Sequence, residues 1–373
     1  MTDGAPPIAV LEVVVSTRAG GGPQHVLTLA KGLRARGWAP LVAGPRDGTL
    51  FDRFPAAGIE IVEVATNRLR PDALLKLMRL VRGRGIRLVH SHGKGAGLHG
   101  RLAARMLGVP AVHTFHGLHF ERYSRPLRHT YLALERMLGR WSRLVVSVSR
   151  VQEREALALD LFPPAISRVV LNGVDVAALT ATALDRWDAR VALGLPPGVP
   201  VVGCAARLDE VKRLDVLLEA VAAVRRPGLV VAIVGAGPEE RRLRARASSL
   251  GLDGSVKFSG EIPGAAHLFR AFDVYAAPSR KEGMPLAVLE AMVLGLPVLA
   301  SDIPAHREVL GDLCEGLVEG TAPAFAAGLQ RVLDDPAAMR AWGALNRMRA
   351  RSEFDAADMV GAMDAVYREA LGV

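Results

Sequence analysis

The sequence predicts an α/β protein made of two successive units, each with a parallel sheet covered by helices. Three observations support this prediction. Short apolar segments typical of strands alternate with segments of helical periodicity. This alternation begins again near residue 200. The length of 373 residues is enough for two domains, each with its own hydrophobic core.

The first series begins with the apolar run at residues 8–15, followed by Gly20-Gly21-Gly22 and a helical pattern over residues 24–36. Further strands are expected at Trp38–Ala43, Leu88–Ser91, Ala111–Phe115 and Leu144–Val148. These runs are continuously apolar, so we expect a sheet that is buried on both faces.

The second series predicts five more strands and two helices. Strands are expected at Val201–Ala205, Val230–Val234, Val256–Phe258, Val274–Ala276 and Val298–Ala300, with helices at residues 213–224 and 238–250. The segment Leu195-Pro196-Pro197-Gly198-Val199-Pro200 is typical of a linker. We therefore expect domains over residues 1–190 and 191–350.

Composition excludes several classes of protein. Half of the residues are hydrophobic and the mean hydropathy is +0.23, which excludes a disordered chain. No uncharged apolar run reaches the roughly 18 residues of a membrane span. The N-terminus lacks the basic segment of a signal peptide. Two cysteines, Cys204 and Cys314, are too few for a disulfide scaffold and favour the cytoplasm.

The positive charge is concentrated in the first half of the chain. The net charge is +9, with +12 in residues 1–190 and −3 in the remainder. Nucleic acid, an anionic membrane or an acidic substrate would each suit this charge. A genome that favours arginine explains the total, because 41 of the 47 basic residues are arginine, but it explains the asymmetry poorly.

Glycines follow two of the predicted strands. Gly20, Gly21 and Gly22 lie between the first strand and the first helix, where a glycine backbone can approach a phosphate closely. The alternative is a plain tight turn. Gly235-Ala236-Gly237-Pro238 is a shorter signal of the same kind. The run 95–100 matches G-x-G-x-x-G, but it lacks the acidic residue of a dinucleotide site, so we expect helix packing there.

Three histidines at i, i+3 and i+6, His113, His116 and His119, raise the question of a metal site. Residues 111–115 are predicted as a strand, in which positions three apart face opposite sides. No cysteine or carboxylate cluster completes a ligand set nearby. We therefore expect no metal there and place His116, at the strand end before Gly117, in a cleft.

The second series contains two groups suited to a diphosphate. Arg207 and Lys212 flank the loop after the strand at 201–205, where two cations can converge on an anion. Glu282-Gly283-Met284-Pro285-Leu286 leads into a predicted helix that contains Glu290. The N-terminus of this predicted helix attracts phosphate, and Pro285 suits a first helical turn. Surface charge and helix capping are the alternatives.

Taken in order, these motifs resemble retaining glycosyltransferases of family 4. The resemblance runs from about residue 10 to residue 309. Glu282 and Glu290 match the E-x7-E motif, and Arg207 and Lys212 match the diphosphate-binding pair. The N-terminal glycine loop, His116-Gly117, Asn172-Gly173-Val174-Asp175 and Gly235–Pro238 match further motifs. The chain departs at Met284 and Pro285, where the proline removes a backbone donor near the phosphate.

The resemblance implies a GT-B fold, in which two facing Rossmann-like domains enclose a deep interdomain cleft. It also implies a C-terminal helix, within residues 351–373, that packs back on the first domain. The implied reaction is metal-independent transfer of a hexose or N-acetylhexosamine from a nucleotide-diphosphate sugar, with no cofactor. Uridine is the commonest base in similar chains.

The same resemblance implies the residue roles. His116, Glu282, Arg207 and Lys212 would be catalytic: the two cations stabilise the departing diphosphate, while Glu282 and His116 hold the sugar. Glu290 would hold the ribose. The remaining donor-binding residues would be Gly21, Gly22, Gly235, Gly237, Ile262, Gly283, Met284, Pro285 and Leu286. The acceptor hydroxyl attacks from the face that the diphosphate leaves.

The segment 119–143 interleaves arginines with Phe120, Tyr123, Tyr131 and Trp141, a composition that suits an anionic membrane surface. We expect a lipid-linked or polysaccharide-precursor acceptor in cell-envelope glycan synthesis, and peripheral attachment to the cytoplasmic face of the membrane. An ordinary amphipathic helix over the sheet is the alternative.

Other functions fit the sequence less well. A soluble transferase acting on a sugar phosphate or a nucleotide-sugar epimerase would keep the fold. Nucleic-acid binding lacks a known module, and a dinucleotide oxidoreductase rests on residues 95–100 alone. The sequence has no G-x-x-x-x-G-K-[ST], G-x-S-x-G, H-E-x-x-H or D-x-D motif.

Overall fold

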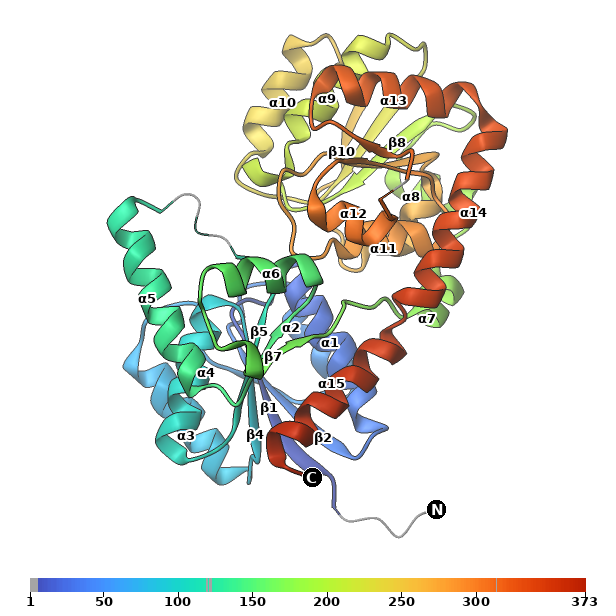
Figure 1. Ribbon diagram of the computed structural model, residues 1–373. Coiled ribbons are helices and arrows are strands. Elements are labelled where there is room, and N and C mark those ends of the chain that lie inside the picture. The colour runs from blue at the N-terminus through green and yellow to red at the C-terminus, as the bar shows by residue number, and fades with distance from the viewer. Residues whose placement is uncertain (1–5, 119, 121–122, 313) are drawn as a thin grey trace. The chain divides into compact units, whose positions relative to one another are not determined.

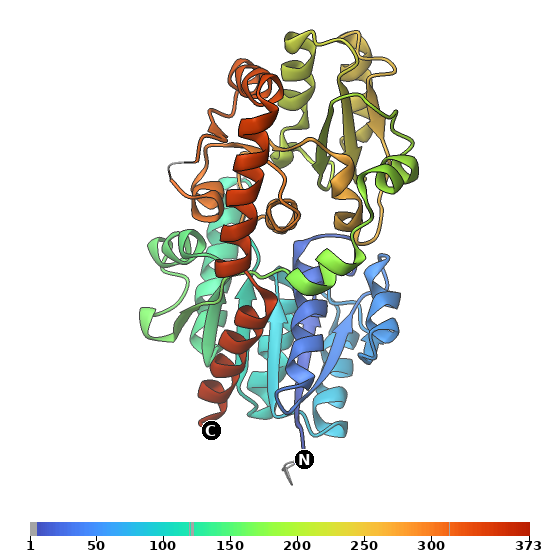
Figure 2. The same cartoon turned by 90° about the vertical axis from the view of Figure 1, so that its right-hand side faces the viewer.

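The computed structural model describes residues 6–118, 120, 123–312 and 314–373, which form two compact units (Figures 1 and 2). Unit 1 contains Met1–Asn172 and Ala356–Val373, and unit 2 contains Gly173–Asp355. Each unit is described by itself.

Unit 1 contains a seven-stranded parallel sheet in the order β3-β2-β1-β4-β5-β6-β7. Its strands are β1 (Ile8–Val14), β2 (Trp38–Gly44), β3 (Ile61–Glu63), β4 (Leu88–His92), β5 (Ala111–Phe115), β6 (Leu144–Ser147) and β7 (Ser167–Val169). Its helices are α1 (Gly21–Arg34), α2 (Leu50–Ala56), α3 (Pro71–Gly83), α4 (Lys94–Leu107), α5 (Arg125–Trp141), α6 (Arg150–Ala158) and α15 (Ala356–Leu371).

Helices cover both faces of this sheet (Figure 1). Successive side chains of a strand point to opposite faces, so Val10 packs with α1 and α15, whereas Leu11 and Val13 pack with α3 and α4. Both faces are therefore apolar, as the continuously apolar strands predicted.

Unit 2 contains a six-stranded parallel sheet in the order β10-β9-β8-β11-β12-β13. Its strands are β8 (Val201–Ala205), β9 (Val230–Val234), β10 (Val256–Phe258), β11 (Val274–Ala277), β12 (Val298–Ser301) and β13 (Leu317–Val318). Its helices are α7 (Val176–Thr182), α8 (Arg186–Leu193), α9 (Leu214–Val224), α10 (Glu240–Ser249), α11 (Leu286–Val293), α12 (Pro304–Leu310), α13 (Ala322–Asp334) and α14 (Pro336–Glu353). Short 3-10 helices lie at Glu210–Lys212 and Ala265–Ala271.

The first domain ends earlier than the expected residue 190, because residues 173–190 belong to unit 2. The physical reason lies in α8, where the buried Arg190 side chain pairs with Asp273 at 3.0 Å and donates to the Ala271 carbonyl at 3.1 Å. These contacts fasten the segment before the predicted linker to the second sheet.

The C-terminal region is shared between the units. Helix α14 belongs to unit 2, whereas α15 belongs to unit 1. Met359, Met363 and Tyr367 of α15 are buried against the first sheet. Trp38 Nε1 donates to Asp364 at 2.8 Å, so this helix completes one face of unit 1.

None of the described helices is both long enough and apolar enough to cross a bilayer.

Candidate active site

In unit 2, the segments that follow β8 and β11 supply the paired charges of the candidate site. Lys212 ends the 3-10 helix after β8, and Glu282 lies in the loop between β11 and α11. Lys212 Nζ donates to Glu282 Oε1 at 2.6 Å. Burial alone would raise the pKa of Glu282, but the Lys212 charge and hydrogen bond outweigh burial and hold this pKa below its ordinary value.

Three buried residues lie next to this loop and escaped the sequence analysis. Ser301 donates to the Ser279 carbonyl, and His306 Nδ1 lies 2.7 Å from the Ser301 carbonyl oxygen. Burial lowers the pKa of His306, so its ring stays neutral even at pH values slightly below its ordinary pKa. These bonds fix the ends of β11 and β12 beside Glu282.

Helix α11 begins directly after this loop. Pro285 immediately precedes the helix instead of lying in its first turn, and Leu286 is the first helical residue. Gly283 and Met284 are buried, and Glu290 lies in the second turn. The structure therefore places Glu282, the helix N-terminus and Glu290 in one short segment, as the E-x7-E spacing predicted.

Arg207 follows β8 and is exposed, with 67% of its side chain accessible. It pairs with Asp209 at 2.5 Å, whereas Lys212 pairs with Glu282. The two predicted diphosphate-binding cations thus have different carboxylate partners.

Gly235 and Gly237 are explained in part by close packing of the protein's own backbone. Gly235 has a φ of +139°, and a Cβ atom there would lie 1.9 Å from the Ala206 carbonyl oxygen. A Cβ atom on Gly237 would lie 2.3 Å from the Leu208 carbonyl oxygen. These glycines let the loops after β8 and β9 touch. Ile262, the remaining predicted donor residue of unit 2, is half-buried beyond β10.

In unit 1, Gly21 and Gly22 form the first turn of α1. A Cβ atom on Gly22 would meet the His116 ring at an ordinary 3.6 Å, and one on Gly20 would meet nothing within 4 Å. Among the described residues, internal packing therefore does not require glycine at positions 20 and 22. His116 follows β5 and lies against this turn.

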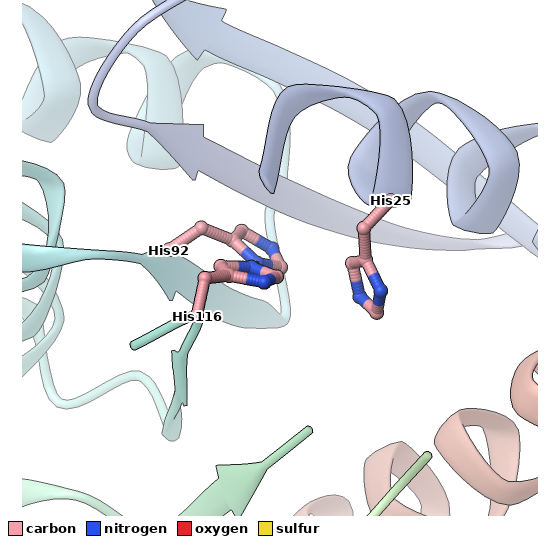
Figure 3. A group of neighbouring side chains, drawn as sticks. All are labelled: His25, His92 and His116. Carbon is pink, nitrogen blue, oxygen red and sulfur yellow. The ribbon is translucent and has the colours of Figure 1, made fainter. Parts of the chain in front are cut away.

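Three histidine side chains from α1, β4 and the end of β5 meet beside Gly22 (Figure 3), and Glu12 of β1 lies next to one of them. His92 Nδ1 lies 3.0 Å from His116 Nε2, and His92 Nε2 lies 2.8 Å from Glu12 Oε2. His25 Nδ1 lies 2.8 Å from Asn172 Oδ1. Burial lowers the pKa of His25 to about 3 and that of His92 to about 4, so both rings are neutral at neutral pH.

Among the described residues, His113 and His116 lie on opposite faces of the sheet, as the strand periodicity predicted. His113 points to the other face of the sheet, where Nδ1 lies 2.9 Å from Ser91 Oγ, while His119 lies outside the described residues. The glycine run 95–100 packs tightly in α4, as expected. A Cβ atom on Gly97 would lie 2.6 Å from the His113 ring, and one on Gly100 3.0 Å from Ser91.

The sequence analysis missed His25, His92 and Glu12. The available signal was the polar pattern V-H-S-H at the carboxyl end of an otherwise apolar strand, together with one carboxylate in the first apolar run. The spacing of His113, His116 and His119 involves only residues close together in the chain. It therefore carries no information about partners of His116 on other strands.

These two parallel-sheet units define a glycosyltransferase of the GT-B class, and comparisons with known proteins agree. The family described as Glycosyltransferase Family 4 matches residues 19–178, and the family described as Glycosyl transferases group 1 matches residues 185–349. The chain therefore belongs to glycosyltransferase family 4, whose two domains these descriptions match.

Named relatives support the assignment. The D-inositol 3-phosphate glycosyltransferase of Saccharomonospora viridis is 32% identical over 76% of this chain and 70% of its own length. The UDP-Gal:alpha-D-GlcNAc-diphosphoundecaprenol alpha-1,3-galactosyltransferase of Escherichia coli is 31% identical over 70% of each chain. The crystal structure of Anabaena Alr3699/HepE in complex with UDP and glucose superposes with a TM-score of 0.85 at 21% identity, covering 96% of this chain and 99% of that one.

Proposed function

We propose that this glycosyltransferase moves a hexose or N-acetylhexosamine from a UDP-sugar, with retention of the anomeric configuration and without a metal ion. The acceptor is a lipid-linked or polysaccharide precursor in cell-envelope glycan synthesis. The observation that carries the proposal is the Lys212–Glu282 pair at the start of α11, with Glu290 in the second turn of that helix.

The charges of unit 2 suit a nucleotide-diphosphate donor. Lys212, Arg207 and the N-terminus of α11 supply positive charge to a departing diphosphate, as preorganised groups whose stabilisation grows as the leaving group becomes more negative. Glu282 remains ionised at neutral pH and accepts hydrogen bonds from sugar hydroxyls. Glu290 holds the ribose hydroxyls.

Unit 1 contributes His116 and the first turn of α1. Burial holds the pKa of His116 well below its ordinary value, so the neutral ring serves as a hydrogen-bond partner for the sugar. The open space beside Gly20 favours close approach of a ligand to the backbone amides of this turn. The acceptor oxygen bonds to the anomeric carbon on the face that the diphosphate leaves, and its proton passes to the diphosphate.

Thermal unfolding in the presence of UDP, GDP, ADP or NAD, all with EDTA, tests the donor site. A nucleotide at about 100 times its Kd adds about 2.7 kcal/mol of stability. We expect UDP to increase the Tm of the wild type. Arg207→Ala and Glu290→Ala should lose this increase, whereas the control Lys257→Ala, at an exposed position, should keep it. No shift with any diphosphate, or a shift that requires a metal, would contradict the proposal.

The first two turns of α5 support a membrane-bound acceptor. Residues 124–130 are all exposed; they include Arg125 and Arg128, and Leu127 is 52% exposed between them. Basic side chains around an exposed apolar one suit the surface of an anionic membrane, so we propose peripheral attachment at its cytoplasmic face. Arg122, part of the same basic segment, lies outside the described residues.

Co-sedimentation with vesicles of anionic lipid tests this attachment. We expect Arg125→Glu/Arg128→Glu to lose binding, and the matched double variant Arg241→Glu/Arg340→Glu, on exposed helices of unit 2, to retain it. Equal co-sedimentation of both double variants would show that α5 is not the anchor.

A small sugar-phosphate acceptor is the second candidate, favoured by the names of relatives such as that of Saccharomonospora viridis. Transfer from a radiolabelled UDP-sugar to inositol phosphate or to a polyprenyl-diphosphate-linked sugar separates the two. Labelled water-soluble product only would replace the lipid-linked acceptor with this candidate.

A further inference from the structure

We propose that His25, His92 and His116 form a binding site in unit 1 for one divalent transition-metal ion of the zinc class. This site is separate from the groups of unit 2 that would bind the donor diphosphate, and the transfer reaction does not need it.

The three side chains come from different elements and converge (Figure 3). His25 extends from α1, His92 ends β4 and His116 follows β5. One nitrogen from each ring lies within 4.8 Å of the others, and two of these nitrogens are only 3.0 Å apart. Nitrogens bound to tetrahedral zinc at about 2.0–2.1 Å lie about 3.4 Å from each other, so a shift of at most about 1.4 Å brings the third ring into place.

The hydrogen bond of His25 directs a lone pair toward the other two rings. The Asn172 amide oxygen accepts a hydrogen bond, so His25 Nδ1 carries the hydrogen and Nε2 carries the lone pair. His25 is 1% exposed, and its Nε2 atom has no hydrogen-bond partner among the described residues. A buried nitrogen without a partner is uncommon in folded proteins, and a bound metal ion would satisfy it.

Glu12 orients His92 in the way that carboxylates orient metal-binding histidines. His92 Nε2 donates to Glu12 Oε2 at 2.8 Å, which leaves Nδ1 with a lone pair that accepts a hydrogen bond from His116 Nε2 at 3.0 Å. A metal ion would replace this hydrogen bond, and the His116 hydrogen would move to Nδ1. Tyr367 of α15 donates to the other oxygen of Glu12 at 2.6 Å. The Glu12 carboxylate, 2.8 Å from the His92 ring, would partly balance the charge of a bound ion.

The neighbouring group of Glu12, His90 and His92 also has close ligand atoms, but it is already satisfied. His90 Nδ1 lies 2.5 Å from Tyr367 Oη, and His90 Nε2 lies 2.7 Å from Thr114 Oγ1. His90 therefore supports the network, while the nitrogen without a partner is on His25. Imidazole nitrogens suit zinc, copper or nickel and not magnesium or calcium.

Metal binding has a consequence for catalysis that rests on the proposed function. A bound ion would occupy the His116 nitrogen that faces His92 and hold the ring away from the donor sugar. Zinc is therefore expected to inhibit transfer, although transfer itself requires no metal.

Equilibrium dialysis of chelator-treated protein against Zn²⁺, followed by elemental analysis, tests the site without donor or acceptor. We expect one bound ion per chain, at least tenfold weaker binding in His25→Gln, and wild-type binding in His267→Gln, which removes a half-buried histidine of unit 2. Co²⁺ should give the visible absorption of a tetrahedral nitrogen site in the wild type but not in His25→Gln. Equal binding by wild type and His25→Gln, or no binding by wild type, overturns the proposal.

A second variant and an inhibition assay test the same metal site independently. His116→Gln removes the half-buried ligand and serves as a second variant if His25→Gln does not fold, with circular dichroism as the check on folding. Zinc should inhibit transfer by wild type and not by His25→Gln, which retains His116. One bound zinc without inhibition would support the site and overturn the proposed contact between His116 and the sugar.

Discussion

The role of Lys212 in binding a diphosphate depends on its position beside Glu282. The 3-10 helix after β8 and the loop before α11 bring Lys212 Nζ within 2.6 Å of Glu282. Lys212 is 23% exposed and Glu282 13%, so solvent screens this pair less than the fully exposed pairs of the surface. Lys212 can therefore stabilise an anion that arrives beside it without losing its own position.

Replacing Lys212 by alanine should reduce kcat/KM for transfer from the nucleotide sugar by about 10²–10³, the usual loss when one preorganised donor is removed. Steady-state kinetics with the UDP-sugar identified by thermal shift would measure it. Lys257→Ala, on β10 in the same unit, is the matched control and should retain wild-type kcat/KM. An unchanged kcat/KM in Lys212→Ala would remove this residue from the reaction.

His113 makes the stability of unit 1 depend on pH. Burial, followed by the Arg101 charge, lowers the pKa of His113 well below its ordinary value of 6.5. The folded ring stays neutral where the unfolded ring takes up a proton. The neutral His113 ring therefore makes its full contribution to the free energy of unfolding above pH 6.5. This contribution is lost as the pH falls toward the lower pKa of the folded state.

Urea unfolding of wild type and His113→Gln between pH 8 and pH 5 tests this sign. Each pH unit below 6.5 removes up to about 1.4 kcal/mol of the histidine contribution. Because glutamine does not titrate, the free energy of unfolding of the wild type should fall more steeply with acid than that of the variant. Parallel curves, or a steeper fall in His113→Gln, would show that folding does not lower the pKa of His113.

Helix α15 shows how an element far along the chain completes a sheet near the N-terminus. Tyr367 is buried against Trp38 and His90, and its hydroxyl donates to the buried Glu12 carboxylate of β1. The helix therefore contributes two polar contacts, from Tyr367 to Glu12 and to His90, to the network under the histidines as well as apolar packing.

Tyr367→Phe should lower the free energy of unfolding by about 1.5–3 kcal/mol, because it removes a hydrogen bond to a buried charged group. Chemical denaturation followed by circular dichroism measures this. The control is Tyr123→Phe, whose half-buried hydroxyl accepts a hydrogen bond from Lys94 at 3.1 Å and which should change stability by no more than about 0.5 kcal/mol. Equal effects of the two variants would mean that the Tyr367–Glu12 bond contributes little.

At the scale of the whole molecule, the chain is divided between two units with separate cores. The first core includes Val10, Leu88 and Met363, and the second includes Val202, Leu217 and Leu329. The candidate diphosphate-binding cations lie in unit 2, whereas the histidine cluster lies in unit 1. Ligands for the two sites should therefore stabilise different parts of the chain.

Hydrogen–deuterium exchange with mass spectrometry checks this division. UDP in EDTA should slow exchange most around β8 and the start of α11, whereas Zn²⁺ without nucleotide should slow exchange around β4, β5 and α1. Binding slows exchange by reducing local opening of the segments that it contacts. Protection by UDP confined to unit 1, or by Zn²⁺ confined to unit 2, would contradict the assignment of these sites.

Local patterns predicted most of the elements and one half of the candidate site. Continuous apolar runs identified the long strands, because a strand between two helical layers contacts apolar side chains on both faces. Short strands such as β3, β7 and β13 were missed, since two or three residues carry little periodicity. The E-x7-E segment was predictable because Glu282, the start of α11 and Glu290 are neighbours in the chain.

The sequence by itself determined the class of the protein and the position of its motifs. The tertiary structure decided that residues 173–190 join unit 2 and that Lys212 faces Glu282, whereas the family resemblance had already implied that the C-terminal helix packs on the first domain. The tertiary structure also brought His25, His92 and Glu12 to His116. Parallel strands place the ends of distant segments side by side, so contacts at these ends depend on strand order, which periodicity along the chain does not encode.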